Sequence, residues 1–181
     1  AIIVAGGKGT RMKSLVPKQF MLLGGRPILM QTIEKFRNAN SKSEIIVVLP
    51  KNEFIRWHEL CQEYSFKTPH HLVEGGESRF HSVQNGLASV QEEGIVAVHD
   101  GARPLISIEL IKQCYKEAAE HGSAVPCIPA NESLRKVKGS KNKVVDRNSI
   151  VIIQTPQCFQ VRTLKKAYKA KYKNSVFTIK K

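Results

Sequence analysis

A glycine-rich segment near the start of the chain, Gly6-Gly7-Lys8-Gly9, is followed by Thr10, Arg11 and, after a short gap, Lys18. Glycine allows backbone N–H groups to approach ligand oxygens closely, and it tolerates positive φ angles that other residues avoid. Arginine and lysine add the positive charge that backbone amides lack. The combination is typical of a polyphosphate-binding site. It is not a Walker P-loop, because GxxxxGK[ST] is absent.

Two further polar segments follow apolar stretches. The first is Gly75-Gly76-Glu77-Ser78-Arg79, with Ser82 in the helix predicted after it, and the second is His99-Asp100-Gly101-Ala102-Arg103-Pro104. Ligands of open α/β sheets bind beyond the carboxyl ends of the strands, so we expect these segments to meet the glycine-rich segment there. Asp100 would then help to hold Mg²⁺, or another divalent cation, against phosphate oxygens, because Mg²⁺ usually takes only one or two carboxylates.

The charged residues of these segments also have structural interpretations. Asp100 could cap the next helix or pair with Arg103. Arg79 could simply form an ion pair with Glu77 or Glu74 and have no role in ligand binding. The sequence leaves these alternatives open.

Other polar and aromatic residues are expected to be structural. Ser82 could be an ordinary helical serine rather than a ligand-binding residue. His99 ends an apolar stretch, so we expect a packed, hydrogen-bonded side chain rather than a base. Trp57 and Tyr64 are interpreted as packing residues. No Ser-His-Asp or Cys-His arrangement and no zinc-type spacing stands out.

Apolar runs alternate with segments of helical spacing along most of the chain. Asn52 and Ser107 are predicted to cap two of the helices. The alternation predicts an α/β fold with a mostly parallel sheet and helices on both faces. The predicted strands are residues 2–5, 44–49, 70–74, 95–99 and 123–128, and the predicted helices are residues 28–38, 52–64, 78–90 and 107–120.

Residues 129–148 interrupt this alternation. Pro129, Asn131, Gly139 and nearby lysines predict a hairpin or arm that leaves the body of the protein. The body is expected to resume at residues 150–153. No internal repeat or low-complexity linker is present, so residues 1–181 are predicted to form a single domain.

The composition limits the function classes. There are 29 Lys and Arg residues against 15 Asp and Glu, a formal net charge of +14, which favours anionic partners. The lysines are not interleaved with aromatic residues that could stack on bases, so no nucleic acid is expected. No apolar run approaches the roughly 20 residues that span a bilayer, and no signal peptide is visible. We therefore expect a cytoplasmic protein with no membrane partner and reduced, mostly buried cysteines.

Four segments together resemble a known family. AGGKGTRM…PKQ, GGESRxxSVxxGL, VHDGARP and DRxxxxxxQTPQxF occur in this order over essentially the whole chain. They are similar to those of the 2-C-methyl-D-erythritol 4-phosphate cytidylyltransferases of non-mevalonate isoprenoid biosynthesis. Ser78-Arg79 leading to Ser82-Val83, and Gly101-Ala102, favour this family over the related pentitol-phosphate cytidylyltransferases. Ribitol 5-phosphate, or another polyol phosphate, is the alternative substrate.

The resemblance implies a Rossmann-like nucleotidyltransferase fold, a protruding β-arm and a reaction between CTP and methylerythritol phosphate. Arg11 and Lys18 would offset charge on the α-phosphoryl group and on the departing pyrophosphate. Asp100 would lie where nucleotide, metal and substrate meet. The residues implied to bind the nucleotide are Ala5, Gly6, Gly7, Gly9, Thr10, Arg11, Lys18, Gly76, Glu77, Ser82 and Asp100.

The resemblance also implies a homodimer formed through the arm at about residues 129–148, with part of the substrate site supplied by the neighbouring subunit. The family often carries Asp-Thr in this arm, where this chain has Glu132-Ser133. The family continues past the position of Thr178 with an acidic stretch before a catalytic lysine. Lys180 is therefore expected to be that lysine if residues are missing between Thr178 and Ile179. The residues implied to bind the substrate are Asp100, Arg103, Ser133, Arg147, Thr155 and Thr178.

Overall fold

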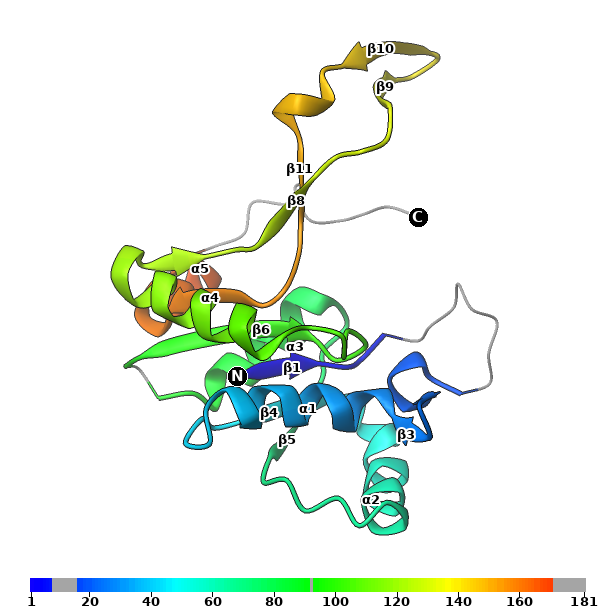
Figure 1. Ribbon diagram of the computed structural model, residues 1–181, viewed down its shortest axis with the longest axis vertical. Helices are drawn as coiled ribbons and strands as arrows, with labels where there is room; N and C mark the ends of the chain where they lie inside the picture. Colours follow the sequence, from blue (N-terminus) through cyan, green and yellow to red (C-terminus); the bar gives the residue numbers. More distant parts are fainter. Residues whose placement is uncertain (8–15, 92, 171–181) are drawn as a thin grey trace.

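The structure is a computed structural model that describes residues 1–7, 16–91 and 93–170. Its centre is a sheet in the order β5-β4-β1-β6-β12-β7 (Figure 1). β5, β4, β1 and β6 are parallel, whereas β12 runs antiparallel to both β6 and β7. The sheet strands are β1 (Ile2–Val4), β4 (Ile46–Leu49), β5 (His71–Glu74), β6 (Ile95–Asp100), β7 (Ser123–Ala124) and β12 (Gln157–Gln160).

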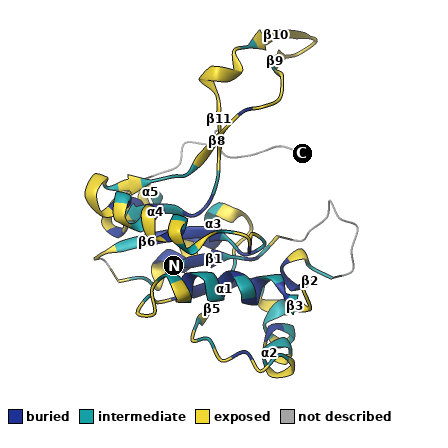
Figure 2. Ribbon diagram, in the orientation of Figure 1, coloured by how far each residue is buried: buried dark blue, intermediate teal, exposed yellow. Residues whose placement is uncertain are grey.

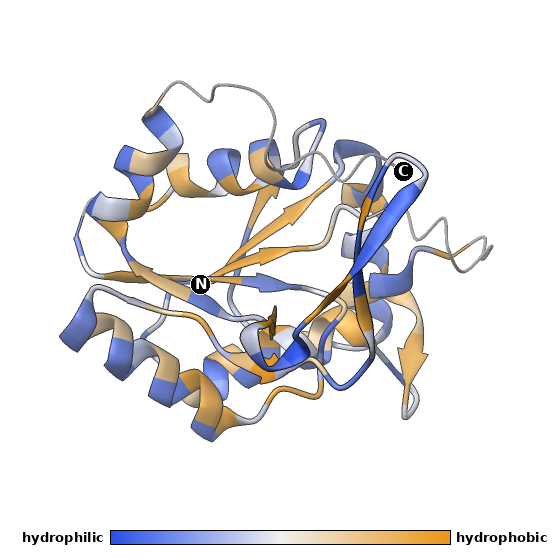
Figure 3. Cartoon of the chain, turned by 90° about the horizontal axis from the view of Figure 1, so that it is seen from above, coloured by the Kyte–Doolittle hydropathy of each residue, from blue (hydrophilic) through white to orange (hydrophobic). Residues whose placement is uncertain are grey.

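Helices cover both faces of this sheet, as the alternation predicted. Because successive side chains of a strand point to opposite faces, Ile2 and Ile3 belong to different cores. The core with Ile3 includes buried residues of α1 (Ile28–Ala39), α2 (Phe54–Glu63) and α4 (Ile108–His121). The core with Ile2 includes α3 (Arg79–Ala88) and α5 (Val161–Lys169). Figure 3 shows the hydrophobic strands between helices of mixed hydropathy.

The helix ends agree with the predictions to within a few residues, with one wrong cap. Ser107 accepts a hydrogen bond from Leu110 N–H at the start of α4, as predicted. Asn52 does not cap α2, because a 3₁₀ turn, η3 (Lys51–Glu53), precedes the helix and Glu53 is the capping residue, without a side-chain cap bond. Pro50 immediately before the turn disfavours helical backbone at Leu49, but it does not determine which residue begins the α-helix.

Gly86 brings α3 close to the sheet. A Cβ atom at this position would lie 2.8 Å from Cγ2 of Ile2 and 3.1 Å from Cγ2 of Val48. Both contacts are with buried strand residues, so the sheet and the helix would have to separate.

We therefore expect Gly86→Ala to lower the free energy of unfolding by roughly 1–2 kcal/mol, since overpacking typically costs more than the helix propensity that alanine gains. Urea unfolding would measure this change. Gln84→Ala, exposed on the same helix, serves as the control. An unchanged or raised stability of the Gly86 variant would contradict the close packing.

The predicted arm exists, but it begins earlier and ends later than residues 129–148. The predicted strand 123–128 is two strands, β7 in the main sheet and β8 (Cys127–Pro129), which pairs with β11 (Val151–Ile153). Pro126 lies between β7 and β8 and cannot donate a ladder hydrogen bond. β11 was expected in the body, yet its three residues are exposed at the base of the arm (Figure 2). An apolar run therefore did not indicate burial here.

The outer part of the arm is a lysine-rich hairpin of β9 (Leu134–Lys138) and β10 (Lys141–Val145). Lys136 pairs with Lys143 and Lys138 with Lys141, so four lysines share one face. All four are exposed, and Figure 3 shows the hairpin as strongly hydrophilic. This part of the positive charge therefore lies on a solvated surface.

Among the described residues, no helix combines the length and the apolar character that crossing a membrane requires. All four cysteines are free, as expected for reduced thiols. Cys114 and Cys158 are buried, whereas Cys127 is exposed on the arm.

Candidate active site

The carboxyl ends of three parallel strands bring the candidate segments to one edge of the sheet. Val4 pairs with Asp100 and with Val48, which places the ends of β1, β6 and β4 at the same level. The backbone ladder continues beyond the strands, because Ala5 N–H donates to Val48 O (2.9 Å) and Gly101 N–H donates to Val4 O (2.8 Å). Glu74 at the end of β5 pairs with Leu49, and Gly75 N–H donates to Leu49 O at 2.8 Å, so the expectation that the segments after β1, β5 and β6 lie at one edge is confirmed.

The glycine-rich segment is described only through Gly7. Ala5 is buried, Gly6 is half-buried and Gly7 is exposed, as a surface that receives a ligand requires. Gly9, Thr10 and Arg11 lie outside the described residues, so their predicted roles remain predictions.

Gly101 fixes the position of the turn after β6 against this first segment. Its N–H donates to Val4 O, and its carbonyl accepts from Thr32 Oγ1 at 3.0 Å. A Cβ at Gly101 would lie 2.9 Å from Cβ of Ala5. Only a glycine therefore allows the two segments to approach this closely without a shift of the backbone.

Ser82 holds the glycine loop after β5. Its side chain is buried, and its Oγ accepts a hydrogen bond from Gly76 N–H at 3.1 Å. The contact that the structure shows for Ser82 is therefore a structural one with the loop backbone, and its role in nucleotide binding remains a prediction. A Cβ on Gly76 would lie 2.4 Å from Cβ of His81, so α3 packs directly against this loop. Glu77 is exposed at the same loop.

Asp100 is held by two arginines. Arg79 donates from Nε and Nη2 to Oδ1, both at 3.2 Å, and Arg103 donates from Nε to Oδ2 at 3.1 Å. The alternative in which Arg79 pairs with Glu77 or Glu74 is wrong. The alternative in which Asp100 pairs with Arg103 is correct, and Arg79 joins that pair. Both carboxylate oxygens thus have donors.

Gln154 is a residue that the sequence analysis did not single out. Its Oε1 accepts from Arg103 Nη1 at 2.7 Å, which anchors the guanidinium that also contacts Asp100. Gln154 belongs to the QTPQ segment, one of the four segments that carry the family resemblance, and this could have marked it as a site residue. However, 51 residues separate it from Arg103, and only the fold brings the two together.

His99 is packed and hydrogen-bonded, as predicted. It is fully buried, its ring lies 5.0 Å from that of Phe36, and its Nε2–H donates to Arg103 O at 3.1 Å. Burial lowers the pKa of His99 to about 4, and this effect exceeds the opposing influence of the carbonyl and of Asp100. A neutral imidazole therefore supports the turn that carries Arg103.

The buried His99 predicts a pH-dependent stability. Its folded pKa of about 4 lies below the unfolded value near 6.5, so the unfolded state binds the proton more readily. Stability is then full above pH 6.5 and falls as the pH drops from 6.5 towards 4. We expect the free energy of unfolding to be roughly 2 kcal/mol lower at pH 5 than at pH 7.5 because of this residue.

Urea titrations at the two pH values, on the wild type and on His99→Gln, would measure the contribution of His99. The variant should show a smaller difference between the two pH values. His70, whose pKa burial also lowers, adds a change of the same sign in both proteins. An equal pH dependence in the variant would show that His99 is not the responsible group.

Lys18 is exposed at the start of a 3₁₀ turn, η2 (Lys18–Phe20). The next two residues, Gln19 and Phe20, are buried, and the Phe20 ring stacks on Trp57 with centroids 6.1 Å apart. Trp57 is fully buried, and its Nε1–H donates to His70 Nε2 at 2.9 Å, which confirms its packing role. The backbone that carries Lys18 is therefore anchored in the core, while Lys18 itself is exposed.

The predicted substrate residues fall into two groups. Arg103 is exposed beside Asp100, and Thr155 is buried just before β12, the neighbour of β6. Ser133 and Arg147 lie on the arm, which projects away from the sheet (Figure 1). Within the described part of the chain, the Thr155 Oγ1 has no hydrogen-bond partner. Thr178 and the predicted catalytic Lys180 lie outside the described residues.

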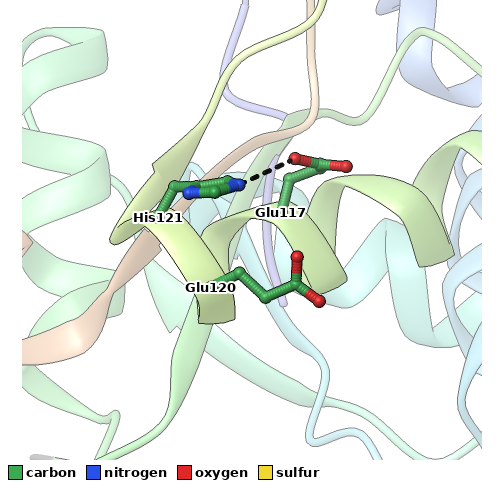
Figure 4. Close-up of side chains that lie close together, drawn as sticks. All are labelled: Glu117, Glu120 and His121. Atoms are coloured by element: carbon green, nitrogen blue, oxygen red, sulfur yellow. Dashed lines mark ion pairs between the residues drawn. The ribbon is translucent and has the colours of Figure 1, made fainter.

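A second group of potential metal ligands lies at the far end of α4. Glu117, Glu120 and His121 present one ligand atom each within 4.8 Å of one another, and His121 Nε2 is 3.6 Å from Glu117 Oε2 (Figure 4). Glu120 and His121 are exposed, and a histidine in the last helical turn also interacts favourably with the helix dipole. Glu117 and His121 are therefore explained as a surface pair, and Glu120 forms a separate ion pair with Lys116 at 3.9 Å.

The fold and the site at its carboxyl edge are those of a nucleotidyltransferase. A family model described as "2-C-methyl-D-erythritol 4-phosphate cytidylyltransferase" matches residues 1–179. The chain belongs to this family. The protein of that name from Bacteroides thetaiotaomicron is 47% identical over 167 residues, which cover 92% of this chain and 76% of the relative.

Solved structures agree with this assignment. The enzyme from Francisella tularensis, titled 2-C-methyl-D-erythritol 4-phosphate cytidylyltransferase, superposes with a TM-score of 0.73 at 30% identity, over 92% of this chain and 75% of that one. The 4-diphosphocytidyl-2C-methyl-D-erythritol synthase from Anaerococcus prevotii has a TM-score of 0.81 at 22% identity, over 97% and 78% of the two chains. The second similarity supports the fold alone.

Proposed function

We propose that this chain joins CTP and 2-C-methyl-D-erythritol 4-phosphate to give the CDP-linked alcohol and pyrophosphate, a step of non-mevalonate isoprenoid biosynthesis. The observation that carries the proposal is the family match along residues 1–179, and it is supported by a sheet edge at which Gly6, Gly7, Gly101 and Asp100 come together. A cytoplasmic location goes with this activity.

In the proposed reaction, a phosphate oxygen of the alcohol attacks the α-phosphorus of CTP. The new P–O bond forms as the bond between the α-phosphorus and the bridging oxygen of the β-phosphate breaks, and pyrophosphate leaves with that electron pair. No covalent enzyme intermediate is needed, so the protein contributes positioning and charge. Lys18 and Arg11 are the residues proposed to stabilise the charge that develops on the phosphoryl oxygens.

The nucleotide is proposed to lie across the site edge. Its phosphates would contact the backbone of Ala5, Gly6 and Gly7, and then Gly9, Thr10 and Arg11. Its cytosine would lie at the loop of Gly76, Glu77 and Ser82. Support comes from the hydrogen bond of Gly76 to buried Ser82, because a loop that is held before the ligand arrives loses less entropy on binding.

The alcohol phosphate is proposed to contact Asp100, Arg103 and Thr155 of one subunit. The buried Thr155 hydroxyl supports this role, because buried polar atoms normally have a partner, and this one has none among the described residues. Ser133 and Arg147, on the arm, would come from a second subunit. Thr178 and Lys180 keep their predicted roles in substrate binding and catalysis.

A homodimer would place the arm of one subunit at the site of the other. The base of the arm exposes Ile128, Val151, Ile152 and Ile153, each by 46–52% of its surface. Ile128 and Ile152 are cross-strand partners on one face of this two-stranded ribbon, whereas Val151 and Ile153 lie on the other face, so both faces offer apolar surface to an interface. Light scattering coupled to size exclusion would measure the molar mass, and a monomer at micromolar concentration would contradict this part of the proposal.

Asp100 fits a divalent cation such as Mg²⁺. It is a partly exposed carboxylate at the strand end, Mg²⁺ needs only one or two carboxylates beside phosphate oxygens, and the present partners of Asp100 are surface-accessible arginines. A bound cation would supply positive charge to the phosphates. The protein's own contribution is then to hold Asp100 in place.

Two measurements test the proposal. In the presence of Mg²⁺, CTP should raise the melting temperature more than ATP, GTP or UTP, since a ligand that binds the native state at a hundred times its Kd adds about 2.7 kcal/mol. Pyrophosphate release should require methylerythritol phosphate. Release with ribitol 5-phosphate instead would favour the pentitol-phosphate activity, and the absence of release with either substrate would overturn the proposed reaction.

A further inference from the structure

The two arginines at Asp100 differ in how they are held. Arg103 makes a second side-chain hydrogen bond, to Gln154 Oε1 at 2.7 Å, and its own carbonyl accepts from buried His99. For Arg79, the side-chain hydrogen bonds recorded among the described residues both go to Oδ1 of Asp100, at 3.2 Å. Arg103 is therefore anchored from two sides, whereas Arg79 depends on Asp100.

Arg79 also connects two parts of the site, the glycine loop after β5 and Asp100 at the end of β6. It is the first residue of α3, directly after the Ser78 cap and three residues before Ser82, which holds the glycine loop. Its side chain crosses from this loop to the end of β6 and is about half exposed. Asp100 pairs in register with Val4, the residue before Ala5, so a rotation of the Arg79 side chain would move its charge from Asp100 towards the first glycine-rich segment, after β1, without any change in the buried core.

We propose that Arg79 is a positioning residue that makes cation binding at Asp100 depend on the nucleotide. The inference rests on the proposed function. The Arg79 guanidinium occupies Oδ1 and the Arg103 guanidinium occupies Oδ2, so a divalent cation at Asp100 must displace one of them, and Arg79 is the less firmly anchored of the two. The triphosphate offers Arg79 another set of anionic oxygens, so the nucleotide releases Oδ1 for the cation.

The geometry limits the size of the effect. The Arg79 and Asp100 side chains are 47% and 32% exposed, and exposed ion pairs of this kind are weak. Removing Arg79 should therefore tighten nucleotide-free cation binding by about twofold to fivefold. Linkage requires that the nucleotide and the cation enhance each other's binding equally, so the same variant should reduce this mutual enhancement.

The experiment measures Mn²⁺ binding by electron paramagnetic resonance, first without nucleotide, on the wild type, Arg79→Gln and Asp100→Asn. Arg79→Gln should bind Mn²⁺ about two to five times more tightly than the wild type, and Asp100→Asn should lose this site. Arg162→Gln is the matched control, because Arg162 forms an exposed pair with Glu93 at 2.8 Å away from the site, and it should match the wild type. Circular dichroism confirms that each variant is folded.

The second part repeats the titrations with a non-hydrolysable CTP analogue. The analogue should enhance Mn²⁺ binding more in the wild type than in Arg79→Gln, and Arg79→Lys should restore part of the difference. Equal nucleotide-free affinities in the wild type and Arg79→Gln would overturn the inference, as would a gain that persists in the Asp100→Asn background. Failure of the analogue to bind the wild type would instead contradict the proposed function. The Mn²⁺ affinities of the wild type and Arg79→Gln without nucleotide would still decide whether Arg79 competes with the cation for Asp100.

Discussion

Lys18→Ala is expected to lower kcat by about 10²–10³-fold while leaving the affinity for CTP close to that of the wild type. The physical reason is that the proposed contact strengthens as charge develops during phosphoryl transfer, and such a contact contributes to kcat rather than to ground-state binding. The fold should be unaffected, because Lys18 is exposed and its buried neighbours Gln19 and Phe20 remain in place.

Steady-state pyrophosphate release measures kcat, and calorimetric titration measures CTP affinity. Lys42→Ala provides the control, because this exposed lysine lies in the turn between α1 and β4, at the opposite edge of the sheet. Lys18→Arg should retain part of the activity, since it keeps the charge with a different geometry. A Lys18→Ala enzyme with wild-type kcat would remove this lysine from the proposed chemistry.

Gly76→Ala is expected to raise KM for CTP by about tenfold or more with little change in melting temperature. The added Cβ would lie 2.4 Å from Cβ of His81 and 3.1 Å from its carbonyl carbon, so the loop backbone must move. That movement breaks the hydrogen bond between Gly76 N–H and Ser82, and one lost hydrogen bond in a binding loop corresponds to about a factor of ten.

The measurement pairs KM for CTP with the melting temperature in Gly76→Ala and Gly86→Ala. The two variants should give opposite results, because Gly86 lies in α3 and packs against Ile2 and Val48 of the sheet, whereas Gly76 is exposed at the loop. Gly86→Ala should melt at a lower temperature with an unchanged KM. An unchanged KM for Gly76→Ala would show that the loop after β5 does not hold the nucleotide.

Local patterns predicted most of the sheet and its helices because burial repeats along the chain with the period of each element. The run from Ile45 to Leu49 is almost completely buried, and it forms a central strand as predicted. The same signal failed for Val151, Ile152 and Ile153, which are apolar but exposed on the arm. A hydrophobic run therefore does not by itself show that its residues are buried within the chain.

The candidate site was predicted as a set of segments but not as a set of contacts. Strand ends, glycines and charged residues are local features, so Asp100, Gly76 and Ser82 could be selected from the chain alone. The partner of Arg79 could not, because nearby glutamates are closer in sequence than Asp100, which is 21 residues away. Gln154, a further partner of Arg103, was missed for the same reason.

The order of residues by itself determined the alternation of strands and helices and the glycine turns, since each depends on neighbours within a few positions. It also determined the family, through four short segments that occur in a fixed order along the chain. Only the tertiary structure decided which groups share an environment. Parallel pairing of β1 with β6 sets Val4 beside Asp100, and burial between β6 and α1 keeps His99 neutral below the turn that carries Arg103. Distances and desolvation arise from packing of remote segments, which no local pattern encodes.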